Sequence, residues 1–248
     1  MKRWFPAIAL LCLSAYGLAQ TVDELVGKNI EAKGGLDRIK AVKTHRMTGR
    51  AEQSDQPPLT VVVENARPDE IRRDITVAGM TVVRAYDGRA GWMIQPFSGR
   101  KDPQLMGEDD LRDLTLDADI DGPLVDYKSK GNKVELLGKE KVEGTDAYKL
   151  KVTLKNGDIV YYYLDPDTYL EIRKETQEFI RGSIRENVTD LGSYKPVNGV
   201  MFPFSIATGP KNDPSSWQTV TIDKIEANVK LDNADFAVPA SLKQSVKK

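Results

Sequence analysis

The segment with the clearest chemical potential holds two carboxylates separated by one proline, Asp165 and Asp167 in LDPDTYL. Two acidic side chains could act as the general acid and base of a hydrolase. However, aspartate favours the first position of a type I turn and proline the second, because the proline ring presets φ. The flanking stretches YYYL and YLEI are typical of strands. We therefore interpret Asp165 to Asp167 as a turn at the rim of a sheet.

Other catalytic and metal-binding residue types are scarce. The chain has one histidine, His45, whereas a serine or cysteine triad needs a histidine base and catalytic zinc sites use several imidazoles. The sequence contains no Gly-x-Ser-x-Gly or phosphate-binding glycine motif. The acidic run from Asp117 to Asp121 lacks the glutamate of a calcium loop, because Lys128 stands at the twelfth position. We predict no catalytic residue, metal or cofactor, and we interpret His45 as an ordinary residue of a first strand.

The N-terminus indicates export from the cytoplasm. Lys2 and Arg3 precede a short apolar run, Ala7–Ala15, and small residues follow at positions 17 and 19. This pattern predicts a signal peptide over residues 1–19, which removes Cys12, the only cysteine of the chain. Residues 20–248 then form one predicted domain of about 229 residues, which must be stabilised by a hydrophobic core. The domain has no basic stripe of the kind that binds nucleic acid.

Two segments have helical spacing. Val22, Leu25, Val26 and Ile30 recur at the period of a helix, and Thr21 is a candidate N-cap. The glycines at positions 34 and 35 interrupt this helix, and a further short turn or two follows up to position 42. The acidic stretch 107–122 carries leucines at helical spacing and predicts a helical insertion between two groups of strands.

The rest of the chain alternates polar and apolar residues with a period of two, and turn residues separate the segments. About eleven antiparallel strands are expected, and the fold class is therefore mainly β (α+β). The expected strands are 60–64, 71–77, 80–86, 90–95, 133–142, 147–155, 159–164, 169–177, 183–191, 200–207 and 217–225.

Some of these strands are apolar on both faces. Residues Ile159–Leu164 are apolar or aromatic throughout, whereas residues 147–155 separate lysines from apolar side chains. A strand that is apolar on both sides needs cover on both sides. A helix on one face and partner side chains on the other would supply that cover, and so would a cavity lined by these residues.

Four stretches, in this order, resemble the periplasmic outer-membrane lipoprotein carriers (LolA-like proteins). They are the Arg67-Pro68 turn, the hairpin with Asp87-Gly88, Trp92 and Pro96-Phe97, the hairpin at 162–168, and the ending at 234–239 with Phe236 and Pro239. The sequence is most similar to the exported "outer membrane lipoprotein-sorting protein" branch. It is longer than the best-known carriers in the helical insertion and second half.

This resemblance implies an unclosed antiparallel β-barrel around an apolar cavity, with a helical lid over it. It implies a non-enzymatic periplasmic carrier that binds the acyl chains of lipoproteins or related lipids for transfer toward the outer membrane. Its partners would be an inner-membrane donor and an outer-membrane acceptor, and a monomer is expected. The alternative is a lipid-sensing or lipoprotein-sensing adaptor on the same fold.

The resemblance also suggests site residues. In such carriers the arginine of the Arg-Pro turn bonds to lid backbone and holds the cavity closed, so Arg67 is the candidate lid latch. The candidate cavity lining consists of Met80, Val82, Trp92, Ile94, Tyr161 and Tyr163. The opposite faces of these strands would carry Val83, Met93 and Tyr162, and a register error of one residue would exchange the two sets.

Overall fold

The computed structural model describes residues 20–53 and 56–243. The predicted signal peptide, residues 1–19, lies outside the described residues. Three α-helices occur in the described part: α1 (Val22–Ala32), α2 (Leu36–Ala41) and α3 (Glu108–Ala118). None of the described helices is long and apolar enough to cross a membrane. Four short 3₁₀ turns also occur, η1 (Pro96–Ser98), η2 (Pro214–Ser216), η3 (Asn233–Asp235) and η4 (Ala240–Leu242).

Helix α1 begins where the sequence predicts. The Thr21 hydroxyl accepts from the Glu24 amide at 3.2 Å, and the Glu24 carboxylate accepts from the Thr21 amide at 2.9 Å. This reciprocal capping box satisfies two backbone donors that a helix start otherwise leaves unpaired. Leu25 and Val26 on its inner face are buried against the strands of the second half. The capping box and the apolar face together place α1 against the sheet.

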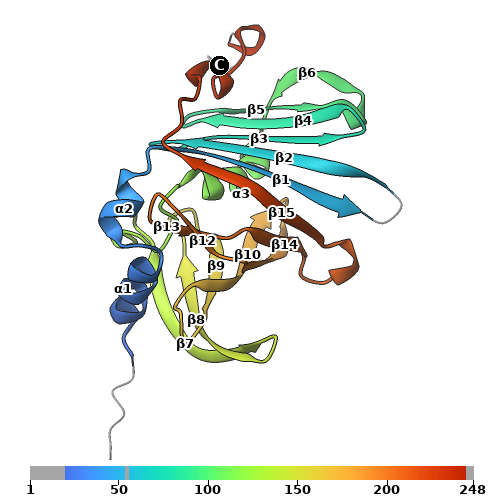
Figure 1. Cartoon of the computed structure of the whole chain (residues 1–248). Helices are drawn as coiled ribbons and strands as arrows, with labels where there is room; N and C mark the ends of the chain where they lie inside the picture. The colour runs from blue at the N-terminus through green and yellow to red at the C-terminus, as the bar shows by residue number, and fades with distance from the viewer. Residues whose placement is uncertain (1–19, 54–55, 244–248) are drawn as a thin grey trace, which may run out of the picture.

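Thirteen strands form one antiparallel sheet, in the order β6-β5-β4-β3-β2-β1-β15-β14-β11-β10-β9-β8-β7 (Figure 1). The two ends of this order, β6 and β7, are not paired with each other, so the sheet is unclosed. The strand bounds in the first half are β1 (Thr44–Gln53), β2 (Gln56–Ala66), β3 (Glu70–Val77), β4 (Met80–Asp87), β5 (Gly91–Gln95) and β6 (Arg100–Leu105). Those in the second half are β7 (Lys133–Val142), β8 (Thr145–Thr153), β9 (Ile159–Leu164), β10 (Glu171–Ile180), β11 (Ser183–Gly192), β14 (Ser205–Pro210) and β15 (Gln218–Ala227).

A separate hairpin of β12 (Lys195–Val197) and β13 (Val200–Phe202) lies beside α1 and α2 (Figure 1). The amide of Met201 donates to the carbonyl oxygen of Lys33 at the end of α1, at 2.9 Å. The glycines at the two turns, Gly34 and Gly199, also approach closely. Helices α1 and α2 and the β12–β13 hairpin therefore pack together against the sheet. We call this unit the cover.

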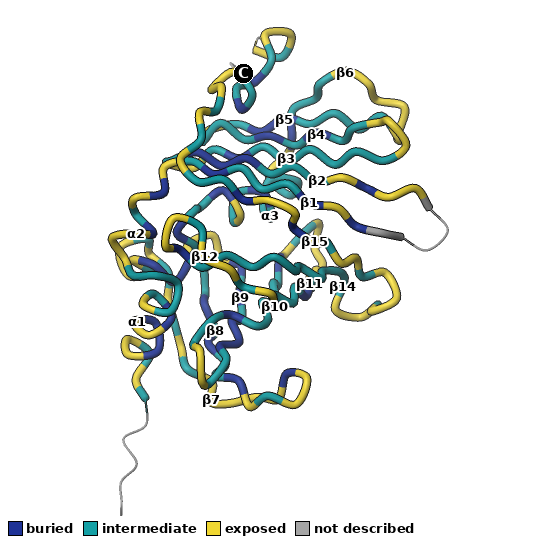
Figure 2. The backbone as a smooth tube through the Cα atoms, viewed as in Figure 1, coloured by how far each residue is buried: buried dark blue, intermediate teal, exposed yellow. Residues whose placement is uncertain are grey.

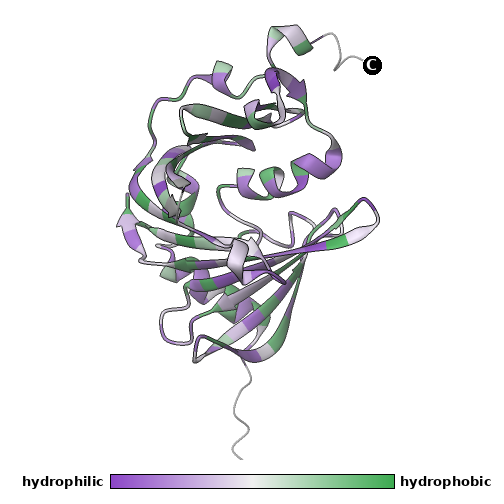
Figure 3. Cartoon of the chain, turned by 90° about the vertical axis from the view of Figure 1, so that its right-hand side faces the viewer, coloured by the Kyte–Doolittle hydropathy of each residue, from purple (hydrophilic) through white to green (hydrophobic). Residues whose placement is uncertain are grey.

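The sheet curls around α3, which lies inside the curve (Figure 3). Arg73 on β3 and Lys174 on β10 both contact Asp117 of α3, at 2.7 and 3.2 Å. Arg84 on β4 forms a bidentate ion pair with Asp113, with hydrogen bonds of 2.7 and 2.8 Å. These contacts identify the concave face of both halves of the sheet. Buried residues concentrate in the middle of the strands, and exposed residues at the hairpin ends (Figure 2).

The predicted unclosed, mainly β architecture is confirmed, but the expected number of strands was too low. Strand β1 (THRMTGRAEQ) alternates only weakly, and the sequence predicts a first strand at His45 without giving its bounds. Strand β6 (RKDPQL) contains Pro103 and does not show the pattern of a strand. Pairing with β2 and with β5 makes these segments strands. The single strand expected at 200–207 is divided between β13 and β14, with Pro203 at the break.

Replacing Gly34 by alanine should destabilise the protein by at least about 2 kcal/mol, as measured by urea unfolding. Gly34 has φ +116°, and a Cβ there would lie 2.1 Å from the carbonyl oxygen of Gly199. Gly27→Ala is the matched control, because Gly27 lies within α1 and a Cβ there would meet no neighbouring segment within 4 Å. It should be neutral or stabilise by up to about 1 kcal/mol. Equal effects of the two substitutions would contradict the close packing of the cover.

Candidate functional site

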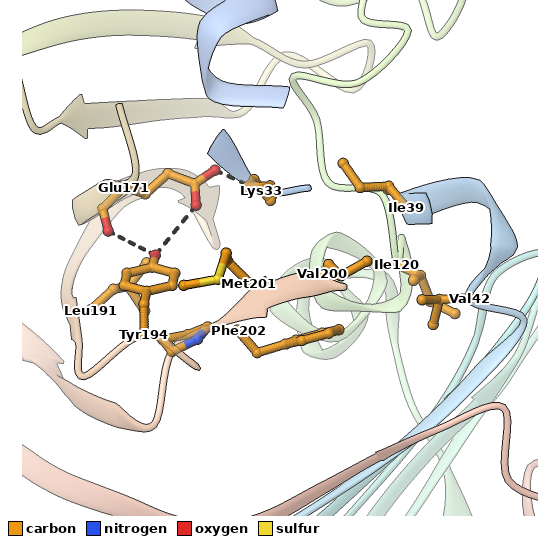
Figure 4. A pocket seen from close by; sticks show the side chains of 11 residues that line it. Lys33, Ile39, Val42, Ile120, Glu171, Leu191, Tyr194, Val200, Met201 and Phe202 are labelled. Atoms are coloured by element: carbon orange, nitrogen blue, oxygen red, sulfur yellow. Dashed lines mark hydrogen bonds and ion pairs between the residues drawn. The ribbon is translucent and has the colours of Figure 1, made fainter. Parts of the chain in front are cut away.

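A cavity of about 160 Å³ lies between α2, β13, the segment after α3 and the ends of β10 and β11 (Figure 4). Most of its wall is apolar. The apolar side chains are Ile39, Val42, Ile120, Leu191, Val200, Met201, Phe202 and Pro203. Ile39, Val42 and Val200 form a buried cluster of their own, against which Ile120 and Phe202 pack. The cavity therefore lies where the cover meets the sheet.

One end of the cavity is polar. Lys33, the C-cap residue of α1, lies 3.3 Å from a carboxylate oxygen of Glu171 at the start of β10. The Tyr194 hydroxyl donates to the backbone carbonyl of Glu171 at 2.7 Å and approaches its carboxylate at 3.4 Å. Burial and the adjacent Glu171 charge raise the pKa of Tyr194 well above its ordinary value, so its hydroxyl is a donor at neutral pH. Figure 4 shows these three side chains together, on the side opposite Ile39 and Val42.

Arg67 joins the walls of the cavity. Its Nε donates to the carbonyl oxygen of Val42 at 2.7 Å, and its Nη2 donates to that of Ile39 at 3.0 Å. Nη2 also pairs with Asp121, the residue after Ile120. Val42, Ile39 and Ile120 all line the cavity. One guanidinium therefore holds both α2 and the segment after α3 against the Arg67-Pro68 turn. These contacts join the cover to the sheet; the latch function suggested for Arg67 stays a prediction.

Asp121 completes this network. Its side chain is 4% exposed, and Lys40 of α2 donates to its second oxygen at 2.5 Å. Burial by itself would raise the pKa of Asp121, but the hydrogen bonds from Arg67 and Lys40 outweigh it and lower the pKa to about 2. The carboxylate is therefore ionised at neutral pH and binds both cations. Because its partners come from α2 and from the β2–β3 turn, its charge helps to join the cover to the sheet.

His45 lies behind the apolar wall. Its ring is buried and packs against Phe202, with ring centroids 5.8 Å apart. Burial lowers the pKa of His45 to about 4, so the ring is uncharged at neutral pH. It lies on β1, as the sequence predicts, and it acts as packing beside the cavity.

The candidate lining residues of β4 and β5 lie on two faces of the sheet. Val82 and Met80 are on the face of Arg84, which contacts α3, and Met80 is exposed at the strand end. Ile94 pairs with Val83 of β4. Ile94 and Trp92 therefore lie on the face of the sheet opposite to Arg84. There Trp92 donates its Nε1 proton to the carbonyl oxygen of Phe236 at 3.0 Å. The register thus separates residues that the sequence grouped together.

The three tyrosines of β9 alternate in the same way. Tyr162 pairs with Lys174, which contacts α3, and its ring packs in the buried cluster under α1. Tyr161 and Tyr163 lie on the opposite face, where the Lys149 ammonium is 4.9 and 5.0 Å from their ring centroids. Burial raises the pKa of Tyr163 to about 12. Of the three, Tyr162 is the one directed into the curve of the sheet.

The Asp165 carboxylate serves the turn between β9 and β10. Its Oδ1 accepts from the amides of Asp167 and Thr168, at 3.1 and 2.8 Å, and from the Thr168 hydroxyl at 2.9 Å. Burial would raise the pKa of Asp165, but these hydrogen bonds lower it overall. This geometry agrees with the interpretation as a turn.

The sequence reasoning missed the residues that line the cavity of about 160 Å³. They come from five separate segments, and most belong to short elements with no strong periodicity. The available signals were the apolar spacing of Ile39 and Val42, and the apolar run 200–202 after the Asn198-Gly199 turn. Neither signal says that the two segments meet.

Comparison with solved structures shows a shared fold. The chain is similar to an outer membrane lipoprotein-sorting protein domain from Vibrio parahaemolyticus, with 13% identity, a TM-score of 0.57, and coverage of 92% of this chain and 100% of the other. It is also similar to a LolA superfamily protein from Nitrosomonas europaea, with 14% identity, a TM-score of 0.58, and coverage of 89% and 99%. A DUF1329 family protein from Desulfovibrio piger has 14% identity, a TM-score of 0.56, and coverage of 87% and 97%.

No protein-family model matches the sequence, and no curated protein matches it. At identities this low, the similarity to solved structures establishes the fold alone. The resemblance deduced from the sequence is confirmed at that level.

Arg67→Lys should lower the free energy of unfolding by about 2 kcal/mol in urea titrations, because a lysine ammonium cannot reproduce the planar fork that reaches three acceptors. Hydrogen exchange of the α2 amides should also become faster. Arg50→Lys is the control, since Arg50 forms an exposed pair with Asp223 and should change stability by no more than about 0.5 kcal/mol. Equal effects at both positions would show that the Arg67 contacts contribute little.

Asp121→Asn should reduce the loss of stability in acid. The ordinary pKa of this carboxyl is 3.8 and the folded value is about 2, so its contribution is present above about pH 4 and disappears as pH falls toward 2. Stability curves of the wild type and variant should therefore converge between about pH 4 and pH 2. The pKa of His45 is lowered from 6.5 to about 4, so its effect on stability falls between about pH 6.5 and pH 4 and is the same in both proteins. Parallel curves below pH 4 would contradict this assignment.

Proposed function

Because the chain has a LolA-like fold, we propose that it is a non-enzymatic periplasmic carrier. It binds acyl chains of lipoproteins or related lipids in the cavity under the cover and transfers them toward the outer membrane. The observation that carries this proposal is an apolar cavity whose walls come from two parts of the fold, the sheet and the cover. The lipoprotein-sorting description of the Vibrio domain supports the same function.

The size of the cavity requires movement of the cover. A volume of about 160 Å³ is close to that of an apolar protein cavity that binds benzene, so it holds only part of an acyl chain. Each further methylene that enters gains about 0.8 kcal/mol. Displacement of α2 and β13 away from the sheet would lengthen the cavity. The contacts of Arg67 oppose that displacement, so binding would shift an equilibrium between closed and open positions.

The charged contacts around α3 support the same location for the lipid. Arg73, Arg84 and Lys174 on the concave face are all paired with carboxylates of α3. An acyl chain placed there would separate these pairs in a partly buried environment, at a cost of several kcal/mol. The apolar region beneath the cover carries no such penalty. We therefore place the acyl chain against Val42, Val200 and Phe202.

Val200→Phe should block lipid uptake while the fold is retained, because the added ring fills a cavity of about benzene size. Uptake is measured by fluorescence of a fatty-acyl probe and by native mass spectrometry of protein purified from the periplasm. We expect apparent affinity to fall at least about tenfold, which corresponds to about 1.4 kcal/mol. Leu137→Phe, at an exposed position on β7, is the control and should bind normally.

Two results would count against the carrier proposal. If the wild type takes up no acyl probe after delipidation, the cavity is not a lipid site. If it binds lipid but does not pass it to acceptor vesicles or proteins, the sensing adaptor becomes the better assignment.

A further inference from the structure

The cavity under the cover is amphipathic. Its two ends differ in chemistry, with Ile39, Val42 and Ile120 at one end and Lys33, Glu171 and Tyr194 at the other (Figure 4). A purely apolar ligand would leave the polar end facing hydrocarbon, which is unfavourable for both charged groups. The polar end therefore indicates a ligand whose head group makes hydrogen bonds there.

The polar end has hydrogen-bonding capacity to spare. An ammonium has three donors, and within residues 20–53 and 56–243 Lys33 Nζ bonds only to Glu171, at 3.3 Å. The Glu171 carboxylate accepts from Lys33, and the Tyr194 hydroxyl, which donates to the Glu171 carbonyl, lies 3.4 Å from it. Both distances are long for charge-assisted hydrogen bonds, which are commonly about 2.7–2.9 Å. A head group that accepts from Lys33 and donates to Glu171 would add one hydrogen bond to each side chain.

Charge balance selects among possible head groups. Lys33 and Glu171 form a neutral pair, and their side chains are 21% and 10% exposed. A carboxylate or phosphate head would place a second anion against one ammonium in this poorly solvated site, which costs free energy. A hydroxyl is neutral and can both donate and accept. It can therefore bridge the two side chains from one side without changing the charge balance.

A second cavity provides room for the rest of the head. It measures about 180 Å³ and shares Lys33, Glu171 and Leu191 with the apolar cavity. Its other walls include Asp121 and Lys174, both already engaged in ion pairs. The Lys33–Glu171 pair thus stands at the boundary between an apolar and a polar chamber. This arrangement matches the division of an amphiphile into tail and head.

We propose that this site binds a single-chain amphiphile with an uncharged, hydroxyl-bearing head, of the monoacylglycerol type. The hydroxyl lies beside the Lys33–Glu171 pair, where it accepts from Lys33 and donates to Glu171, and the tail lies against Val42, Ile120 and Phe202. We specify a single chain because the apolar cavity of about 160 Å³ already holds only part of one acyl chain before the cover moves. This inference rests on the proposed function and specifies which lipid class the site prefers.

The test compares two probes with the same tail, monooctanoylglycerol and octanoate, by isothermal titration calorimetry at fixed ionic strength and neutral pH. The wild type should prefer monooctanoylglycerol by about tenfold. Glu171→Gln leaves the Lys33 charge unbalanced, so octanoate binding should improve and the preference should shrink or invert. Glu135→Gln is the matched control. Glu135 is an exposed residue of β7 that pairs with Lys151 of β8, so this substitution should leave the ratio of the two affinities unchanged.

A second variant covers the case in which Glu171→Gln does not fold. Lys33→Gln makes the site anionic, so octanoate binding should fall by a larger factor than monooctanoylglycerol binding. The double variant is neutral again and should restore the wild-type preference.

The outcomes separate this inference from the proposed function. Binding of both probes with a ratio that none of the variants changes would overturn the head-group assignment and leave the carrier proposal intact. Failure of the wild type to bind either probe or the fatty-acyl probe would overturn both. A ratio that changes equally in Glu135→Gln would show a general surface-charge effect and would also overturn the assignment.

Discussion

The ion pairs between α3 and the concave face of the sheet constrain where an apolar cavity can lie. A curled open sheet must cover its inner face, and here that face carries Arg73, Arg84 and Lys174. Helix α3 neutralises them with Asp113 and Asp117, and Asp117 contacts both halves of the sheet. Partly buried cations need paired counter-charges, so the position of α3 is constrained by the strands on either side.

This constraint determines where an apolar cavity can exist. The region around α3 is occupied by ion pairs, whereas the region beneath α2 and β13 is lined by aliphatic and aromatic side chains. The cavity is therefore displaced from the centre of the curve toward the cover. Arg67 and Asp121 join the cover to the sheet at this point, and their contacts are with backbone and charge rather than with the cavity itself.

In the proposed carrier, the contacts of Arg67 with α2 are distinct from the apolar contacts that would bind the acyl chain. In the proposed carrier, the hydrogen bonds of Arg67 to α2 would have to break for cargo to leave, while the apolar side chains of α2 and β13 would remain as binding surfaces. The carrier proposal requires this behaviour, because cargo must enter and leave the site. The pair of Lys33 and Glu171 adds polarity at one end of the cavity, and it also joins the C-cap of α1 to the start of β10.

The sequence by itself determined the elements whose signals are local. The capping box of Thr21 and Glu24, the turn at Asp165 and most of the strands follow from residue types within a few positions of each other. Resemblance over short motifs extended this to the unclosed barrel. Only the tertiary structure decided that Tyr162, rather than Tyr161 or Tyr163, is directed into the curve. The physical reason is that a strand apolar on both faces has no pattern that distinguishes them. The tertiary structure also determined the position of the cavity, because its walls come from segments that are distant in the sequence and meet only through long-range packing.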